Sequence, residues 1–582
     1  MENKAKTVWE LLGAKPGAAM VSVLLVIAAA VLHVAEVIVL QRFIDGFSDF
    51  CWNRAFLFAA ILAGIYGFHY VQGPLSDYLK EKIALQLRSS LESVVVEKAA
   101  RISVEALEDQ ENQALLARLQ DRSEKRFANG FFAMLQILSG VVGMTGIFAL
   151  AIEHAVYFLP PVLLLLGLLV IAFRLIGKNR ETLYRARAEI GRRSGYLSDV
   201  LFDRRLAQEK KLFGYTPYIQ QLYEEENIHS NRKLLKSIFF SNLILWFYDN
   251  ITYLFSASAY LLFLIPLHAG KMDIGLYIAM IPALAKVGNF FVTVGSNYLP
   301  DYQEYRSCYK DMEKLIASPE QYYVQKETDC APPFHVIKGE GIVFRYPGQE
   351  KPVLDGLNFI FHVGKNYALV GENGCGKTTL IKLLMGFYRP ERGRITIDGE
   401  DIQEMEFGKL QRFFSAVFQD FNRYNYTIKE NICMSDVRAD SGMEHAAKEA
   451  DLAEWIVSCP EGYATKLGSL EEGGVDLSGG QWQRLSIARM LYRKAGICVW
   501  DEPTASMDPL AESRLYTNFF KKKSGDCANI FVTHRLGAAV GADEICVMEN
   551  GRLIEQGSHR QLMQMEDGLY HRMFEAQKGM YQ

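Results

Sequence analysis

The chain has 582 residues, of which 50% are hydrophobic and 22% are charged, and its formal net charge is −4. That length is enough for several domains of about 100–200 residues each. A charge this small for the length gives no indication of nucleic-acid binding. Nine cysteines are scattered without a CxxC or CxxxC pair, which fits neither a zinc site nor a disulfide scaffold, so we interpret them as reduced thiols.

The average composition hides a division of the chain. Residues 1–310 carry long apolar runs, residues 335–582 have the mixed composition of a soluble α/β domain, and residues 311–334 form a predicted linker. The N-terminal stretch "MENKAKTVWELLGAKPG" mixes both charge signs, and no convincing cleavage site follows the first apolar run. We therefore expect that run to stay in the mature protein as a membrane anchor.

Six segments of the first half are long and apolar enough to cross a bilayer, which takes about 20 residues in a helix. They are residues 18–40, 55–74, 129–151, 155–174, 238–266 and 274–299. Only "AIEH" separates the third from the fourth, and Pro160 and Pro161 would interrupt one longer helix. We predict a tight hairpin there.

The distribution of Lys and Arg predicts the orientation of these spans. Residues 75–130 hold nine and residues 174–237 hold fourteen, whereas the other three connections hold only Arg42, Arg54 and Lys271. The two charged segments and both termini are therefore expected in the cytoplasm of a multi-pass cell-membrane protein. Both segments are rich in helix formers, so we expect helices that extend from the membrane and reverse near 106–118 and 210–218.

The second half contains a phosphate-binding pattern. "GENGCGKT", from Gly371 to Thr378, matches G-x-x-x-x-G-K-[ST], with an apolar strand pattern before it and a helix pattern after it. Backbone N–H groups of such a loop surround phosphate oxygens, Lys377 would reach the β- and γ-phosphates, and Thr378 would hold Mg²⁺.

A second apolar strand ends in two acidic residues, in "GICVWDEPT". Asp501 is placed to supply the other Mg²⁺ contact, and Glu502 beside it can polarise the attacking water. A solvated strand end would explain an acidic pair equally well, but the distance from the phosphate loop and the Pro503 turn favour the catalytic interpretation.

At these residues the chain resembles a half-unit of the ATP-binding cassette (ABC) transporters of the exporter type. Its "LSGGQ", Leu477–Gln481, is the diagnostic motif of that family, and the similarity extends over nearly the whole chain. Departures are mild: Cys375 replaces a usual Ala or Ser, and Met507 replaces a Leu. The resemblance implies a membrane all-α domain of six helices fused to an α/β P-loop ATPase domain.

The resemblance also implies roles for single residues. Tyr346 resembles the aromatic residue that stacks on adenine, Gln419 the glutamine that reaches Mg²⁺ and the attacking water, and His534 the switch histidine on the γ-phosphate. Catalysis is expected from Glu502, His534 and Gln419, and Mg²⁺ binding from Thr378, Gln419 and Asp501. ATP is expected to contact Tyr346, Gly371, Glu372, Asn373, Gly374, Cys375, Gly376, Lys377, Thr378 and Thr379.

In the family, each ATP lies between the phosphate loop of one subunit and the "LSGGQ" of the other. The resemblance therefore implies a second half-transporter, as a homodimer or as a heterodimer with a related subunit, in which Ser478, Gly479, Gly480, Gln481 and Asp508 act on the opposite site. ATP would hold the two halves together, and its cleavage would release them and open a path alternately to either side of the membrane.

The transported substrate is not identified by the sequence. His33, Glu36, His69, Asp249 and Lys286 are ionisable residues inside predicted spans, where charge is costly and often functional. They are candidates for the substrate path, although buried helix–helix pairs would explain them too, and His33 with Glu36 is too little for a metal site.

Three functions remain open from the sequence. The architecture resembles exporters of drugs, peptides and lipids, so export of a small molecule, peptide or lipid is the main hypothesis. Some proteins of this architecture import siderophores or metal chelates. An ATP-driven regulator or channel is a third class, against which the complete set of hydrolytic motifs argues.

Overall fold

The computed structural model describes residues 16–154, 193–203, 206–321, 332–436, 441–468, 473–504, 509–521 and 527–579, with eight single positions between them (160, 164, 167, 168, 171, 174, 175 and 507). The chain divides into two compact units. The first comprises residues Met1–Ile102 and Ala106–Pro319, and the second comprises Ser103–Glu105 and Glu320–Gln582. The change of unit at Pro319 falls inside the predicted linker.

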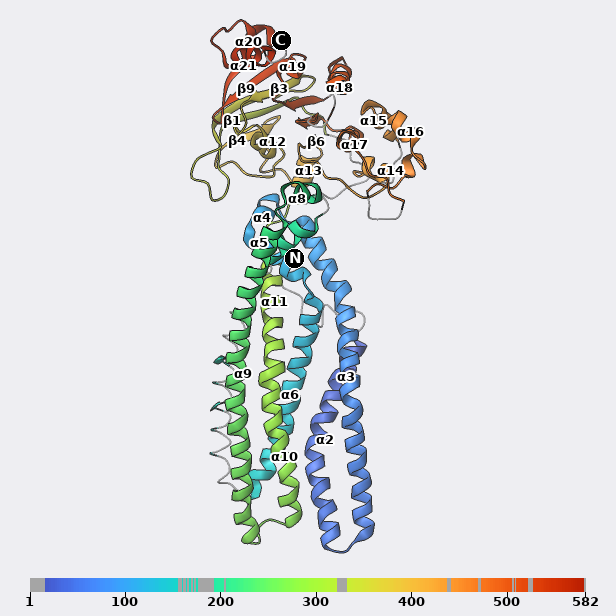
Figure 1. The fold of residues 1–582 in the computed structure, drawn as a ribbon, viewed down its shortest axis with the longest axis vertical. Helices are drawn as coiled ribbons and strands as arrows, with labels where there is room; N and C mark the ends of the chain where they lie inside the picture. The colour runs from blue at the N-terminus through green and yellow to red at the C-terminus, as the bar shows by residue number, and fades with distance from the viewer. Residues whose placement is uncertain are drawn as a thin grey trace. The chain divides into compact units, whose positions relative to one another are not determined.

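The first unit is built from long helices that run side by side (Figure 1). Its elements are α2 (Gly17–Ser48), α3 (Trp52–Arg101), the end of α4 (Val104–Glu108), whose first two residues belong to the second unit, α5 (Gln110–Gln120), α6 (Ser123–His154), α8 (Ala207–Phe213), α9 (Thr216–His268), α10 (Ile274–Thr293), the π-helix η3 (Val294–Tyr298) and α11 (Leu299–Ala317). Five segments of the described chain are long and apolar enough to cross a membrane: Gly17–Ser48, Trp52–Arg101, Ser123–Glu153, Thr216–His268 and Ile274–Ala317. They contain the predicted spans except the fourth, 155–174, which lies outside the described residues apart from single positions.

Glycines let α6 approach its neighbours closely. A Cβ on Gly140 would lie 1.9 Å from the ring of Phe290 on α10, and one on Gly146 would lie 2.4 Å from Val34 on α2. Small residues at helix contacts are a common device where lipid supplies no hydrophobic drive for helix association. The contacts of α2, α6, α9 and α10 bury a core that includes Val37, Phe263 and Phe291.

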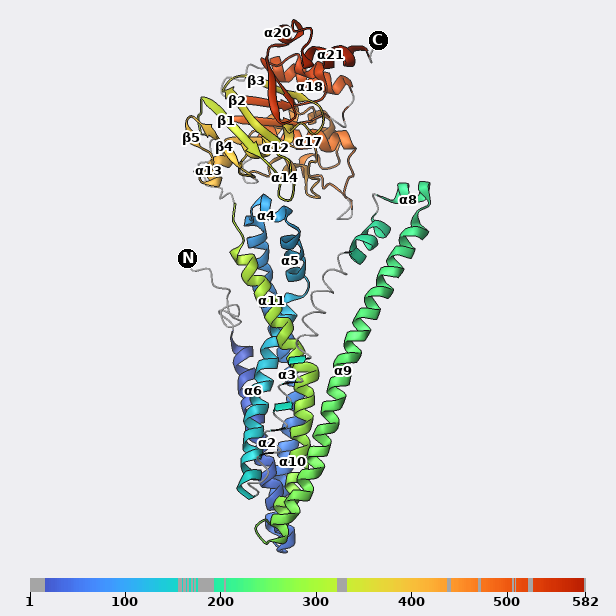
Figure 2. The same cartoon turned by 90° about the vertical axis from the view of Figure 1, so that its left-hand side faces the viewer.

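One helix departs from this bundle. Figure 2 shows α9 packed beside α10 at one end and diverging from the other helices toward α8. The turn between α8 and α9 is formed by Gly214, whose φ of 64° is a left-handed conformation that closes the end of α8. The expected reversal at 210–218 is thus seen as a helix end followed directly by a new helix.

Charge pairs fix α5 to the last helix of the unit, α11. Arg118 on α5 donates two hydrogen bonds to Asp311 on α11, at 2.7 and 3.0 Å. Both side chains are largely buried, with 22% and 12% of their surface exposed. Lys314 adds an exposed contact to Glu111 at 2.8 Å. The bidentate pair of Arg118 with Asp311 thus fixes α5 against α11.

The second unit contains two sheets. The four-stranded sheet has the order β2-β1-β4-β5, with antiparallel pairing throughout, and the six-stranded sheet has the order β10-β9-β3-β8-β7-β6. The strands are β1 (Val336–Phe344), β2 (Leu354–His362), β3 (Asn366–Gly371), β4 (Arg392–Ile397), β5 (Glu400–Asp401), β6 (Phe414–Val417), β7 (Ile497–Asp501), β8 (Ala528–Val532), β9 (Glu544–Glu549) and β10 (Arg552–Gly557). Every residue of β3 is buried, as expected for a central strand covered on both faces.

Helices cover these sheets (Figure 1). They are α12 (Lys377–Leu384), α13 (Phe407–Gln411), α14 (Ile428–Ile432), α15 (Met443–Glu449), α16 (Ala453–Ser458), the 3₁₀-helix η4 (Gly462–Ala464), α17 (Gly479–Tyr492), α18 (Pro509–Lys521), α19 (Leu536–Ala539), α20 (His559–Met563) and α21 (Leu569–Gly579). The core between the sheets and α12 includes Phe361, Tyr367 and Ile381. A second core, including Trp482 and Trp500, joins α14–α17 to β7 and forms a helical lobe.

We predict that Asp311→Asn destabilises the helical unit. The substitution leaves the Arg118 guanidinium largely buried without its carboxylate, and breaking such a pair costs about 3 kcal/mol. The expected result is a clear fall in the melting temperature of the detergent-purified chain. Glu81→Gln is the matched control, because it removes the exposed pair of Glu81 with Lys125 and should change the melting temperature little. Equal effects of the two substitutions would contradict the prediction.

Candidate functional site

Parallel pairing brings four predicted site segments to one edge of the six-stranded sheet. Strands β3, β8, β7 and β6 pair in parallel, so their carboxyl ends lie at the same edge. The phosphate loop follows β3, His534 follows β8, Glu502 follows β7, and Gln419 follows β6. Gly371 and His534, which are 163 positions apart in the sequence, therefore lie at the same edge of the sheet.

The phosphate loop requires glycine where the backbone approaches its neighbours. A Cβ on Gly371, at φ 152°, would lie 2.2 Å from the Met548 carbonyl oxygen, and one on Gly376, at φ 104°, would lie 2.6 Å from Leu354. Lys377 begins α12 and is buried, and its ammonium donates to the carbonyls of Gly371 and Glu372, both at 2.9 Å. The charge is thus held inside the loop, at the position that a phosphate would neutralise.

The other predicted nucleotide residues lie on and around this loop. Glu372, Asn373, Gly374 and Thr378 are exposed, whereas Cys375 and Thr379 are buried. The Tyr346 hydroxyl forms a hydrogen bond with Thr379 Oγ1 at 3.2 Å, and its ring lies edge-on to Tyr388 at 5.3 Å. Tyr346 is therefore tied to the helix that begins with Lys377.

The acidic pair occupies the end of β7. Asp501 is 2% exposed, and burial together with the Glu502 carboxylate raises the pKa of Asp501 to about 6, against the lowering effects of a hydrogen bond with Thr378 and of the Lys377 ammonium. Asp501 Oδ1 has no hydrogen-bond partner among the described residues. A buried carboxylate oxygen without a partner, next to a threonine hydroxyl, fits Mg²⁺, which prefers hard oxygen ligands.

Glu502 has an unusual backbone conformation. Its φ is 47°, a left-handed value that is uncommon for a residue with a side chain and that often marks functional positions. Its Oε1 lies 3.2 Å from His534 Nδ1, and the carboxylate is only 14% exposed. The turn thus directs the carboxylate across the strand ends toward the loop after β8. Gln419, two residues beyond β6, is exposed.

The "LSGGQ" segment lies in the helical lobe. Ser478 caps α17 in a capping box: Ser478 Oγ accepts from Gln481 N–H at 3.3 Å, and Gln481 Oε1 accepts from Ser478 N–H at 2.9 Å. Ser478 is exposed, and Gly479, Gly480 and Gln481 are half-buried. The start of α17 therefore presents backbone N–H groups at the surface of the unit. Asp508 lies outside the described residues.

Sequence reasoning gave no role to Arg489, which ties α17 to the segment after Gln419. The Arg489 guanidinium donates to the Asn431 carbonyl and side-chain oxygens, both at 2.9 Å, and lies 4.8 Å from the centre of the Tyr424 ring. Asn431 is fully buried. The signal was present, because arginine in the middle of an apolar helix face needs partners.

Gln577, near the end of α21, was missed as well. Its side-chain N–H donates to the His534 carbonyl at 2.5 Å, and its Oε1 accepts from Leu536 N–H at 2.9 Å. Next to it, Arg535 contacts Glu512, which also accepts from Thr504 Oγ1 at 2.8 Å. These contacts fix the loop that carries His534 on both sides of that residue's peptide group. No local sequence pattern around Gln577 could have indicated its contact with this loop.

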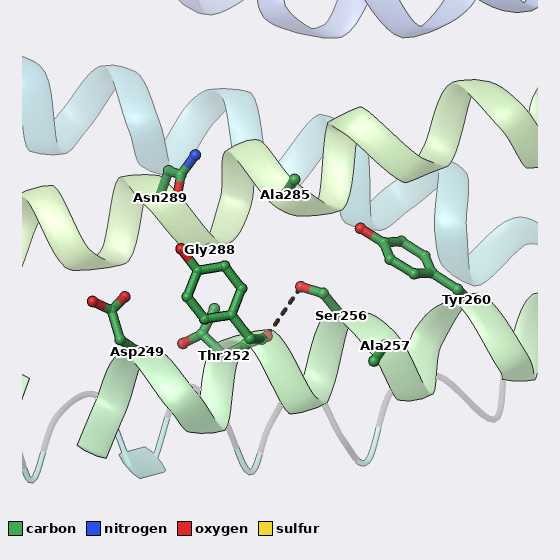
Figure 3. A pocket seen from close by; sticks show the side chains of 9 residues that line it. Asp249, Thr252, Ser256, Ala257, Tyr260, Ala285, Gly288 and Asn289 are labelled. Carbon is green, nitrogen blue, oxygen red and sulfur yellow. Dashed lines mark hydrogen bonds between the residues drawn. The ribbon is translucent and has the colours of Figure 1, made fainter. Parts of the chain in front are cut away.

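The candidates of the first unit separate into two places. His33, Glu36, His69 and Lys286 come together between α2, α3 and α10. Asp249 lies elsewhere, at a cavity of about 120 Å³ between α9 and α10 that Thr252, Ser256, Tyr260 and Asn289 also line (Figure 3). The five candidates therefore do not form one site.

Comparison with known proteins agrees with this geometry. The family profile "ABC transporter" matches residues 354–505, and "ABC transporter transmembrane region" matches residues 19–285. The subtilin transport ATP-binding protein SpaT of Bacillus subtilis is 29% identical, over 89% of this chain and 84% of its own length. The nisin transport ATP-binding protein NisT of Lactococcus lactis subsp. lactis is 27% identical, over 85% of this chain and 83% of its own.

Two further similarities are partial or structural. The mitochondrial iron-sulfur clusters transporter atm1 of Neurospora crassa is 35% identical, over 50% of this chain and 42% of its own length. The structure of a bacterial Atm1-family ABC exporter with ATP bound has a TM-score of 0.83 to this chain and covers 97% of it, and this chain covers 99% of that one. At 24% identity the structural match shows the fold alone.

The fold and the two matched regions define a multi-pass membrane protein with a fused ATPase domain, and the predictions of fold class and of ATP hydrolysis are confirmed. The chain belongs to the ABC transporters, and it is an ATP-driven transporter subunit.

We expect Gln577→Ala to lower maximal ATP hydrolysis by up to about 30-fold, while nucleotide affinity changes little. The substitution removes two hydrogen bonds of about 1 kcal/mol each from the loop that carries His534, and 1.4 kcal/mol corresponds to tenfold in rate. Steady-state ATPase assays over a range of ATP concentrations measure both quantities. Gln564→Ala, at an exposed glutamine beyond α20, is the control, and a wild-type rate for Gln577→Ala would refute the role of α21.

Proposed function

We propose that this chain is one half of a dimeric exporter that moves a small molecule, peptide or lipid out of the cell, driven by ATP hydrolysis between its two ATPase domains. The observation that carries the proposal is the convergence of Lys377, Asp501, Glu502 and His534 at one sheet edge. Export, the dimer and the roles of single residues go beyond the family assignment, so each is argued in turn.

Nucleotide binding is assigned to the phosphate loop and its surroundings. The Lys377 ammonium, now satisfied by two backbone carbonyls, would turn to the β- and γ-phosphates, while the N–H groups of residues 372–376 surround them. The Tyr346 ring would stack on adenine, and its hydrogen bond to Thr379 keeps it next to α12. Glycine at positions 371 and 376 lets the backbone approach the phosphates closely.

Hydrolysis is assigned to Glu502, with His534 and Gln419 as its partners. Glu502 would accept the proton of the attacking water, and its contact with His534 Nδ1 holds the carboxylate in place. Thr378, Asp501 and Gln419 would hold Mg²⁺, which when bound neutralises charge on the phosphate oxygens. Burial of Asp501 favours a cation beside it, because a buried carboxylate is costly without a partner.

A second copy or a related subunit would complete the site. The exposed Ser478 and the N–H groups at the start of α17 form an anion-binding surface that the γ-phosphate of a partner's ATP would occupy, and Asp508 is proposed to act on the same opposite site. The part of α9 that diverges from the other helices is a second argument for a partner subunit. At its α8 end, Leu212, Phe213 and Tyr218 are 78%, 69% and 62% exposed. The neighbouring Lys210 and Lys211 argue against burial of these side chains in lipid, so a protein partner explains their exposure better.

Orientation and direction follow from charge and from the relatives. The bias of Lys and Arg toward residues 75–130 and 174–237 supports a cytoplasmic ATPase domain with both termini in the cytoplasm. Relatives named for transport of subtilin and of nisin match over most of their length, which supports export of a peptide or a similarly amphipathic compound. Import of a metal chelate by the same fold has less support.

Glu502→Gln should abolish ATP turnover while ATP binding persists. The amide keeps the shape of the carboxylate but cannot accept the proton of the attacking water. Release of phosphate by the reconstituted protein measures turnover, and a fluorescent ATP analogue measures binding. Lys377→Ala should instead weaken the binding itself. Turnover at the wild-type rate in Glu502→Gln would remove Glu502 from its proposed role.

The direction of transport is testable in proteoliposomes whose ATPase domains face outward. With ATP outside, an exporter accumulates cargo inside the vesicles, and an importer depletes cargo loaded beforehand. A labelled apolar peptide, a lipid analogue and a ferric chelate would be compared, each against Glu502→Gln vesicles as the matched control. We expect accumulation of at least one of the first two. Depletion of the chelate would favour import, and turnover without movement of any cargo would favour the regulator class.

A further inference from the structure

A cluster of ionisable side chains lies among apolar helices of the first unit. His33 and Glu36, three residues apart, share one face of α2. His69 reaches them from α3, and Lys286 reaches them from α10. Glu36 is only 4% exposed. Groups of this kind are expensive inside a membrane-spanning segment, which favours a function over accidental packing.

The three possible ligands of this cluster converge on one point. One ligand atom from each of His33, Glu36 and His69 lies within 4.8 Å of the others. His69 Nε2 is 3.9 Å from Glu36 Oε2, which is too long for a hydrogen bond. The two imidazole rings are stacked, with their centres 4.5 Å apart and an angle of 11° between their planes.

A neighbouring amide sets the tautomer of His69. His69 Nδ1 lies 3.4 Å from Gln72 Oε1, and an amide oxygen can only accept a hydrogen bond, so the ring proton belongs on Nδ1. The lone pair is then on Nε2, the atom that faces Glu36. Histidine ligands of metals commonly donate their other N–H to an oxygen in this way, which fixes the ring and raises its basicity.

Two ring nitrogens of the cluster make no hydrogen bond within the described residues. His33 Nδ1 and His69 Nε2 are buried and have no hydrogen-bond partner among the residues that the structure describes. A buried polar atom without a partner costs about 1–3 kcal/mol. These two nitrogens and the neighbouring buried carboxylate together offer lone pairs that a metal ion could accept.

We propose that His33, Glu36 and His69 bind a divalent transition-metal ion of the zinc type, with a fourth position open to water or to a donor atom of the cargo. Two imidazoles and a carboxylate are an established ligand set for zinc. Bonds of about 2.0–2.1 Å place tetrahedral ligands about 3.3 Å apart, so the widest pair closes by about 1.5 Å on binding. The stacked rings must also tilt apart, because a metal ion lies in the plane of each imidazole ligand.

Lys286 is the competitor of this metal. Its ammonium contacts Glu36 Oε2 and supplies the positive charge that the buried carboxylate needs. The side chain is 39% exposed, and its ammonium is 6.0 Å from the centre of the Tyr66 ring, so it has both room and a favourable aromatic surface when it leaves Glu36. Metal and ammonium therefore exclude each other at Glu36.

This competition separates metal binding from static helix packing. If the four residues only hold helices together, replacing any of them weakens the same structure. If the site binds metal, loss of a ligand lowers metal affinity, whereas loss of Lys286 raises it. The proposal concerns equilibrium binding in the helical unit and does not depend on what the transporter carries or in which direction.

The test uses the full chain purified in detergent and titrated with Co²⁺ and Zn²⁺. Co²⁺ bound to nitrogen and oxygen ligands in a tetrahedral site gives intense visible absorption bands, and Zn²⁺ should remove them because it binds more tightly to the same ligands. Zn²⁺ affinity is measured by competition with a chromophoric chelator. His69→Ala and Glu36→Gln should each weaken Zn²⁺ binding by more than about 100-fold. Loss of a residue that only hydrogen-bonds to a metal ligand costs at most about 100-fold, so a larger loss indicates a ligand.

Lys286→Gln should strengthen Zn²⁺ binding by about tenfold or more, because it removes a like charge from the site. This variant keeps all three ligands, so it tests the site even if a ligand variant fails to fold. His268→Ala, at the exposed end of α9, is the matched control and should bind Zn²⁺ as the wild type does. The proposal is overturned if wild-type protein gives no Co²⁺ bands, if His69→Ala binds Zn²⁺ as tightly as wild type, or if Lys286→Gln weakens binding.

Discussion

The parallel pairing of β3, β8, β7 and β6 is the constraint on which the candidate ATPase site depends. Each strand delivers one part of the site at its carboxyl end: the phosphate loop, His534, the Asp501–Glu502 pair and Gln419. Parallel strands must be joined by crossovers, so these parts are far apart in the sequence and close in space. A shift of one strand by one residue would turn its side chains to the other face of the sheet and dissolve the site.

Charge burial is handled in the same way in both units. In the ATPase domain, Lys377 is held by two backbone carbonyls, and Asp501 lies next to Thr378 with one oxygen that has no hydrogen-bond partner in the described part of the chain. In the helical unit, Glu36 is held by Lys286, while two imidazole nitrogens have no hydrogen-bond partner among the helices that the structure describes. In each case part of the charge is satisfied internally and part is kept for a ligand. A fully satisfied network would be more stable and would bind nothing.

Most residues of the candidate ATPase site could be proposed from the sequence because their motifs are local. A phosphate loop needs its glycines, lysine and threonine within eight positions, and an acidic pair after a buried strand is recognisable where it stands. The predicted membrane helices were recognisable from their length and polarity, and the structure has helices over all of them except the fourth, which lies outside the described residues. Local patterns could not show that Gln577 fixes the loop of His534, 43 residues away, or that Arg489 binds Asn431, 58 residues away.

The cluster of His33, Glu36, His69 and Lys286 could likewise be predicted only in part from local sequence. The three-residue spacing of His33 and Glu36 on one helix could be seen in the sequence, but the arrival of His69 from α3 and of Lys286, 250 residues from Glu36, depends on helix packing. Close approach of α6 at Gly140 and Gly146 helps to set that packing. Asp249 was grouped with these candidates by polarity alone. It lies on α9 and lines the cavity between α9 and α10, apart from the cluster.

The helix that carries Lys286 also gives the two ends of the first unit a mechanical connection. From Ile274 to Ala317 the chain is helical, and its last portion, α11, is fixed to α5 by the pair of Asp311 with Arg118. The only change of helical type along it is the π-turn of Val294–Tyr298, a kind of irregularity that often marks functional positions. A rotation imposed at Asp311 would therefore reach Lys286 through one continuous element. Because Glu36 lies on α2 and Lys286 on α10, such a rotation would change the contact between the ammonium and the carboxylate.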